Sequence, residues 1–358
     1  DPGARNHVWP LVSHAESLGL GRYGRAELVD LRAHRAKCPD SATWQLELMD
    51  RYLAHTGQLP HLLVVGCSTN RLERAWVQRA CILQVKTLCI MDAGCLANRM
   101  NDLSADEVCN AYGATCEPMA LEIQTLVDRI GVSEPHACLT DVRVIGSTYL
   151  ESLLRPSYPL PSRSDVRARL HARDEMIVVF FASPEEPSLT PPLHIKHILA
   201  ALEALTAALR SCTQSTFLWI RPHPRSSAEL LSAEQMLLEA SELPGLFDSP
   251  DQPDRLSNLE VFCALDVCLS WSSSAVDCAC HSRDSEQKPL IAFLKEGYPG
   301  VETFVNEAMD WAVDGAIPLL SAGEVVAVME GRSDADSFKR MPLACGDWAE
   351  KHIGASVR

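Results

Sequence analysis

Short apolar runs alternate with amphipathic segments along most of the chain. In the first half, runs that favour strands cover 26–32, 61–68, 85–92 and 141–147, and segments with helical spacing cover 41–57, 71–84 and 119–132. The last of these segments contains Gly131 after a Leu/Ile/Val stripe, which is typical of a helix end. Strands that alternate with helices predict a parallel sheet covered by helices.

The same alternation begins again near residue 175. The run at 175–183 is almost continuously apolar, which favours a strand buried on both faces. Further strands are predicted at 215–224, 266–273 and 288–294, and helices at 194–211, 227–242, 255–265, 274–282 and from 321 onward. The pattern therefore predicts an α/β fold with Rossmann-like parallel sheets.

The stretch between the two halves has a different composition. Residues 155–175 contain three prolines, few apolar residues and many charges, which predicts a linker followed by a short polar helix. A chain of 358 residues is long enough for two cores. We therefore expect one Rossmann-like domain at 1–154, the linker at 155–175 and a second Rossmann-like domain at 176–358.

The charge balance argues against one class of function. The net charge is −15, whereas a protein that grips nucleic acid with its whole surface needs clustered Lys and Arg. We therefore expect no nucleic-acid partner, although a small local anion site is compatible with an acidic chain. There is neither a signal peptide nor an apolar stretch of roughly 18 residues, so we expect no membrane span and a cytoplasmic location.

The 14 cysteines do not form a disulfide or metal pattern. They include no CxxC pair and lie mostly inside apolar runs, as buried reduced thiols do. Cys278, Cys280 and His281 lie one or two positions apart on a predicted helix, where side chains diverge. We therefore expect no metal site.

The first candidate site is "WIRPHPRSS". Arg221, His223 and Arg225 follow a predicted strand, and Pro222 and Pro224 stiffen the loop between them. Ligands of parallel sheets bind beyond the carboxyl ends of the strands, and this loop offers charge-assisted donors to a phosphate. The alternative is a solvated loop with incidental basic residues.

The second candidate site is "LSWSSSAVDCAC". Ser272, Ser273 and Ser274 lie between a predicted strand and a helix, where they can cap the helix and bind an anion. Asp277 follows one turn later, where its carboxylate can accept a hydrogen bond from a sugar hydroxyl. An ordinary serine cap explains the same pattern.

Three further loops offer weaker candidates. Asp92 ends a predicted strand before Gly94 and fits either a general base or a helix cap. His7 lies in "DPGARNHVWPLV", residues 1–12, and fits a catalytic or a structural role. We expect Gly3, Arg5 and Asn6 in the same loop, and Gly146 and Ser147 in "VIGSTYLESLL", to border a cleft.

Taken in order, these segments resemble the GT-B-fold nucleotide-sugar-dependent glycosyltransferases, in which two Rossmann-like domains face a cleft. "RPHP" and the later "SSS" are similar to the HP and SS motifs of bacterial sialyltransferases, polysialyltransferases and capsule Kdo transferases. "MDAG" resembles their Asp/Glu–Asp/Glu–Gly motif, with Ala93 at the second acidic position. "DPGARNHV" and "VIGSTYLESLL" are similar to loops of GT-B proteins of capsule and teichoic-acid assembly and of UDP-sugar 2-epimerases.

The resemblance implies a metal-independent, inverting glycosyltransferase that needs no cofactor besides a nucleotide-sugar donor. The C-terminal domain would bind the nucleotide, with His223, Arg221 and the serines on the donor phosphate, and the N-terminal domain would bind a glycan or small-molecule acceptor. Asp92 or His7 would deprotonate that acceptor. Two alternatives remain open: a nucleotide-sugar 2-epimerase, hydrolase or glycerophosphate-type transferase on the same fold, and a non-catalytic GT-B-like binding protein, which Ala93 favours.

Overall fold

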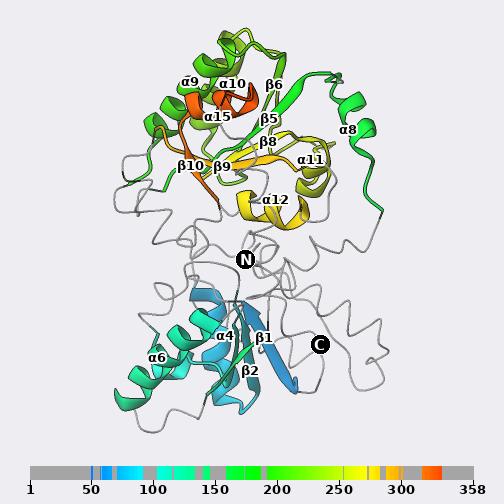
Figure 1. Ribbon diagram of the computed structural model, residues 1–358. Coiled ribbons are helices and arrows are strands. Elements are labelled where there is room, and N and C mark those ends of the chain that lie inside the picture. The colour runs from blue at the N-terminus through cyan, green and yellow to red at the C-terminus, as the bar shows by residue number, and fades with distance from the viewer. Residues whose placement is uncertain are drawn as a thin grey trace. The chain divides into compact units, whose positions relative to one another are not determined.

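The computed structural model describes much of the chain in two compact units. The described residues are 50, 57, 59–66, 71–91, 103–114, 117–133, 140–145, 159–172, 174–186, 192–252, 254–271, 274–282, 288–297, 300 and 317–332. Unit 1 comprises Asp1–Ser152 and Glu350–Arg358, and unit 2 comprises Leu153–Ala349. Figure 1 shows the helices and strands of both units.

Unit 1 contains a parallel sheet in the order β1-β2-β3-β4 (Figure 1). The strands are β1 (Leu62–Gly66), β2 (Lys86–Ile90), β3 (Ala111–Ala114) and β4 (Asp141–Val144). Helix α4 (Arg71–Ile82) packs against β1 and β2, and α6 (Glu117–Ser133) packs against β3 and β4. A short 3-10 helix, η2 (Ala105–Glu107), precedes β3.

The core of unit 1 lies between this sheet and its helices. Val65, Met91 and Tyr112 come from or directly follow the strands, and Val77 and Ile123 come from α4 and α6; together they belong to one buried cluster. Burial of such side chains is the main favourable contribution to folding. The apolar stripes of the sequence therefore face the sheet, as amphipathic helices require.

Unit 2 contains a parallel sheet in the order β10-β9-β8-β5-β6-β7 (Figure 1). The strands are β5 (Met176–Phe181), β6 (Thr216–Arg221), β7 (Gly245–Phe247), β8 (Val267–Ser270), β9 (Leu290–Leu294) and β10 (Leu319–Leu320). Numbered from β5, this is the Rossmann order 3-2-1-4-5-6 read from β7. The direction of strand succession reverses between β5 and β8, and such switch points are where open α/β sheets bind ligands.

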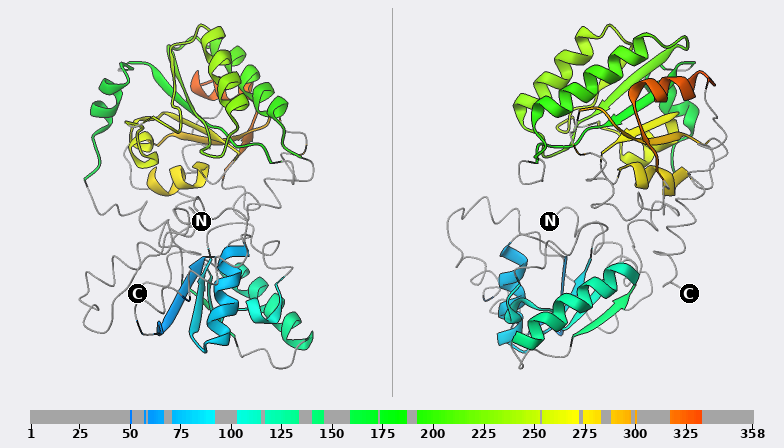
Figure 2. Two further views of the ribbon diagram at one scale, coloured as in Figure 1. Left: turned by 180° about the vertical axis from the view of Figure 1, so that it is seen from behind. Right: turned by 60° about the vertical axis from the view of Figure 1, so that its left-hand side comes forward.

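Helices cover both faces of this sheet (Figure 2). Helix α9 (Ile195–Arg210) packs against α10 (Ala228–Ala240) and α15 (Ala322–Met329) on one face. On the other, α11 (Asn258–Ala264) packs against α8 (Arg163–Arg169) and α12 (Ser274–Ser282). With helices on both faces, β5 is buried along almost its whole length, as its continuous apolar sequence predicts.

The amino-terminal edge of the unit 2 sheet is held by one carboxylate. Asp266, directly before β8, accepts hydrogen bonds from Arg163, from Arg167 at 2.9 Å and from the backbone N–H of Ile177 at 2.8 Å. Helix α8 is thereby attached to the amino ends of β5 and β8. This leaves the opposite, carboxyl-terminal edge of the sheet for the loops with candidate chemistry.

The predicted fold class, two Rossmann-like parallel sheets, is confirmed. Some elements differ from the sequence prediction. The strands β3, β7 and β10 were not predicted, and α6 continues through Gly131 to Ser133, so the predicted helix end is wrong. The short polar helix predicted within 155–175 is α8. The strand predicted at 26–32 and nearly all of the helix predicted at 41–57 lie outside the described residues.

Candidate functional site

The candidate site lies at the carboxyl-terminal edge of the unit 2 sheet. Strand β5 pairs with β6 on one side and with β8 on the other, so the loops that follow these three strands emerge side by side. Neighbouring strands are about 4.8 Å apart, which places the ends of β6 and β8 about 10 Å from each other. The loop with His223 and the start of α12 therefore follow strands that are separated by β5 alone.

The backbone fixes the chemical state of His223. The N–H of Arg225 donates to Nδ1 of His223 at 3.1 Å, and the N–H of Ser226 donates to the His223 carbonyl at 2.9 Å. Because Nδ1 accepts a hydrogen bond, the proton of the neutral ring is on Nε2. Burial, and then the charges of Arg225 and Arg255, lower the pKa of His223 to about 4. At neutral pH the ring is therefore an uncharged donor through Nε2.

Arg255 holds the other end of this loop. Its guanidinium donates to the carbonyl of Pro222 at 3.0 Å, and its Nε lies 3.5 Å from Asp248. The Arg255 side chain thus holds the Pro222 carbonyl, and the backbone N–H of Arg225 holds the His223 ring. A loop held in this way presents its imidazole at a fixed position, as a preorganised binding site requires.

The loop after β5 is tied to the loop after β6. Glu186 accepts a hydrogen bond from Arg225 at 2.8 Å, and Glu185 accepts from both the hydroxyl and the backbone N–H of Ser227, the N-cap residue of α10. Burial opposes ionisation of Glu185, but the hydrogen bonds from Ser227 and from its own backbone are together stronger, and they hold its pKa below the ordinary value. The carboxylate of Glu185 is therefore charged at neutral pH.

Arg221 lies inside the protein. Its side chain is 4% exposed and pairs with Asp248, and it donates to the Leu256 carbonyl at 2.9 Å and to Asn258 at 3.0 Å. The guanidinium carbon lies 5.7 Å from the ring centroid of Trp219. These contacts join β6 to the segment after β7 and to the start of α11. A phosphate contact from Arg221 stays a prediction, and its partners give it a structural role.

The start of α12 contains part of the second candidate site, the segment "LSWSSSAVDCAC". Ser274 is the first residue of α12 and is partly exposed, whereas Asp277 is 4% exposed. Asp277 therefore lies under the surface of the site. Ser272 and Ser273 lie outside the described residues.

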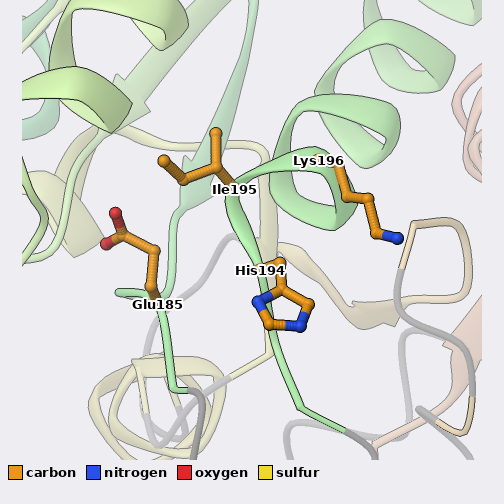
Figure 3. Close-up of a pocket in the computed structure, with 4 residues that line it drawn as sticks. All are labelled: Glu185, His194, Ile195 and Lys196. Atoms are coloured by element: carbon orange, nitrogen blue, oxygen red, sulfur yellow. The ribbon is translucent and has the colours of Figure 1, made fainter.

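A pocket of about 530 Å³ opens at the amino end of α9, beside the loop after β5. It is lined by Glu185, His194, Ile195 and Lys196 (Figure 3). In Figure 3 the carboxylate of Glu185 and the ammonium group of Lys196 point in different directions, with the His194 ring between them. The first turn of α9 contains no acidic residue. The amino end of a helix attracts anions, whereas the charged carboxylate of Glu185 at the same pocket repels them.

Sequence reasoning did not find this pocket or the residues that hold the loop. Glu185 and Glu186 follow a predicted strand, so the carboxyl-end argument used for His223 applies equally to them. His194 and Lys196 begin a predicted helix, which is a weaker signal of the same kind. Arg255 has no local signal, because its contact with Pro222 spans 33 positions.

Several predicted site residues are not tested by the structure. Asp92, His7, Gly3, Arg5, Asn6, Gly146 and Ser147 lie outside the described residues. Within the described part of the chain, no group of three or more His, Cys, Asp or Glu side chains could hold a metal ion, and no helix is long and apolar enough to cross a membrane. Phosphate binding by His223, Arg225 and Ser274 stays a prediction.

Comparisons with known proteins inform the fold. No protein-family model and no curated protein matches the chain. The structure is similar to the N-terminal domain of trehalose-6-phosphate phosphatase from Candida albicans, with a TM-score of 0.52 and 9% identity over 93% of this chain and 75% of that one. It is also similar to an α,α-trehalose-phosphate synthase (UDP-forming) from Burkholderia vietnamiensis, with a TM-score of 0.47 and 10% identity over 99% and 81% of the two chains. At such identities the likeness concerns the fold alone.

Proposed function

We propose that the chain is a glycosyltransferase of the GT-B type whose unit 2 binds a nucleotide-sugar donor at the carboxyl-terminal edge of its sheet. The observation that carries the proposal is the state of His223. The backbone N–H of Arg225 directs the proton of the neutral ring to Nε2, so this atom is a fixed donor beside the switch point of a Rossmann sheet.

The neighbouring groups suit a phosphate. Arg225 is a cation with a long side chain in the same loop, and its ion pair with Glu186 is largely exposed. Exposed ion pairs contribute little free energy, so Arg225 can exchange Glu186 for a ligand oxygen at little cost. Ser274 begins α12, and the amino end of α9 borders the pocket of about 530 Å³. In this proposal His223, Arg225 and Ser274 hold the phosphate together with Ser272 and Ser273, and Asp277 accepts a hydrogen bond from a sugar hydroxyl. Arg221 holds the strand in place through its ion pair with Asp248.

The proposed reaction is direct displacement at the anomeric carbon. The acceptor hydroxyl attacks that carbon, its bond to the donor phosphate breaks, and Asp92 or His7 takes the hydroxyl proton. Negative charge grows on the leaving phosphate as the bond breaks, and the donors of unit 2 stabilise that charge. We propose a metal-independent, inverting reaction that uses no cofactor besides the donor, and an acceptor that is a glycan or a small molecule.

Separate measurements of nucleotide binding and of turnover test this proposal. The intact chain is incubated with nucleotide-sugars of CMP, UDP, GDP and CDP type, and release of the nucleotide is followed with and without candidate acceptors. We expect His223→Ala to weaken nucleotide binding and Asp92→Asn to keep binding but abolish turnover. Turnover that survives in Asp92→Asn removes Asp92 from the mechanism, and binding without turnover of any donor favours a non-catalytic binding protein.

A further inference from the structure

Glu234 lies in the interior of unit 2 without a hydrogen-bond partner. Its side chain is 0% exposed, and neither Oε1 nor Oε2 has a partner among the described residues. It lies on α10 one helical turn from Leu230 and one from Leu238, both of which are buried. A carboxylate in such surroundings is strongly disfavoured, so the group is expected to hold a proton instead.

The charges around Glu234 do not stabilise its ionised form. Burial raises the pKa of Glu234 to about 8, and the negative charge of Glu185 contributes in the same direction. Strand β7, which packs against α10, carries no ionisable side chain. Helix α9, which also packs against α10, buries an uncharged face made of Ile198, Ala201, Leu202, Leu205, Thr206 and Leu209. The side chains of β7 and of the buried face of α9 are therefore all uncharged.

Glu185 holds the amino end of the helix that carries Glu234. Its carboxylate accepts hydrogen bonds from the hydroxyl and the backbone N–H of Ser227, and the Ser227 hydroxyl in turn accepts from the N–H of Leu230 at 3.1 Å. These contacts form the amino end of α10, which follows directly on the loop with His223. Any change that moves Glu185 therefore moves the cap of α10 and the residues before it.

We propose that Glu234 is a neutral carboxylic acid in the binding-competent fold, and that its loss of a proton to water at alkaline pH detaches the start of α10 from Glu185 and opens the loop with His223. The ionised carboxylate of Glu234 then lies without a partner in an apolar interior, which disfavours the packed position of α10, and the like charge of Glu185 acts in the same direction. The anion site is thereby switched off by base. The loss of anion binding rests on the proposed function, whereas the pH-dependent opening of the loop with His223 does not.

Amide hydrogen exchange of the intact chain tests the switch without any ligand. Exchange at residues 225–231, corrected for its intrinsic pH dependence, is measured between pH 6.5 and 9 in the unmodified chain, in Glu234→Gln and in Glu239→Gln. Glu239 is an exposed residue of the same helix and provides the matched control. We expect exchange to rise about tenfold between pH 7 and pH 9 in the unmodified chain and in Glu239→Gln, because the ionised fraction of Glu234 rises by that factor. In Glu234→Gln we expect no rise.

Equal profiles in the unmodified chain and in Glu234→Gln overturn the proposal. If Glu234→Gln does not fold, titration of the carbon-13 signals of the Glu side chains in the unmodified chain replaces it. A Glu234 signal that titrates near pH 8 supports the switch, and one that titrates near pH 4.5 contradicts it.

Binding of inorganic pyrophosphate separates the switch from the proposed function. We expect the unmodified chain to lose affinity for pyrophosphate between pH 7 and pH 9, and Glu234→Gln to keep it. Loss of affinity to the same extent in both chains contradicts the link between Glu234 and the anion site. If pyrophosphate does not bind at any pH, the proposed anion site fails, and the exchange experiment still decides whether the switch exists.

Discussion

Arg221 and Asp248 form an ion pair whose side chains are only 4% and 3% exposed. Asp248 directly follows β7, and its backbone N–H donates to the carbonyl of Ile220 at 3.0 Å, so the pair joins two neighbouring strands at their carboxyl ends. Removing one member of a buried pair leaves the other charge without compensation. This pair therefore holds the strand from which the loop with His223 emerges.

The first prediction concerns this ion pair. We expect Arg221→Met to lower the free energy of unfolding by about 3–5 kcal/mol, because Asp248 then stays buried and keeps, among the described residues, a single cation, Arg255, whose Nε is 3.5 Å away. Urea unfolding measures the change. Arg210→Met, an exposed residue at the end of α9, is the control and should cost less than about 1 kcal/mol. A cost as small as that of the control contradicts the structural role of Arg221.

The second prediction concerns the opposite edge of the sheet. Asp266 accepts hydrogen bonds from two arginines and one backbone N–H, and we expect Asp266→Asn to cost about 2–3 kcal/mol because hydrogen bonds to a charged group are lost. The urea midpoint measures this cost, with Asp254→Asn, an exposed residue, as the control. Because Asp266 lies at the amino-terminal edge, nucleotide affinity should not change, and a specific loss of affinity contradicts this assignment.

The third prediction concerns Gly297. Its φ is +90°, and a Cβ there meets the His197 carbonyl oxygen at 2.1 Å, in the first turn of α9. We expect Gly297→Ala to cost about 1–3 kcal/mol for the steric clash, in addition to about 1–2 kcal/mol for the left-handed backbone. Gly331→Ala is the matched control, since its φ is +68° and a Cβ there meets no atom within 4 Å. Thermal unfolding of the two variants separates the cost of the clash from the cost of the left-handed backbone. Equal losses of stability in the two variants contradict a cost from the contact with α9.

The fourth prediction concerns the pH dependence of stability. The pKa of His223 is about 4 in the folded chain, against an ordinary value near 6.5, so the unfolded chain binds a proton there first as the pH falls. The contribution of the neutral ring is therefore present above pH 6.5 and is lost between pH 6.5 and pH 4. We expect His223→Asn to lose less stability than the unmodified chain over this range in urea titrations at fixed pH. Parallel losses in the two chains contradict the lowered pKa.

The sequence contained enough information to predict the strands and helices that carry the site. The continuous apolar run at 175–183 marked the central strand, and the position of His223 directly after a strand placed it at the edge where parallel sheets bind ligands. The short strands β7 and β10 could not be predicted, because three and two residues are too few for a periodic pattern. Strand β3, with the sequence AYGA, has little β propensity of its own and depends on its neighbours in the sheet.

Pairings between distant residues account for most of what sequence reasoning missed. The ion pair of Arg221 is one example, because its partner Asp248 is 27 positions away and nothing local in the sequence indicates that the two meet. Glu234 is different, because it lies four positions from Leu230 and four from Leu238 in the helix predicted at 227–242, where this spacing puts all three on one face. An acidic residue on the apolar face of a predicted helix was therefore a signal that the sequence already contained.

The most direct test of the proposed donor site compares nucleotide-induced stabilisation in His223→Asn and His171→Asn. His171 is an exposed histidine after α8, at the opposite edge of the sheet, and its φ of 55° is one that Asn tolerates. With nucleotide at 100 times its dissociation constant, we expect about 2.7 kcal/mol of stabilisation in the unmodified chain and in His171→Asn, and most of it to be lost in His223→Asn. Equal stabilisation of the two variants, or no stabilisation of the unmodified chain by CMP, UDP, GDP or CDP, contradicts the assignment of the donor site to the loop with His223.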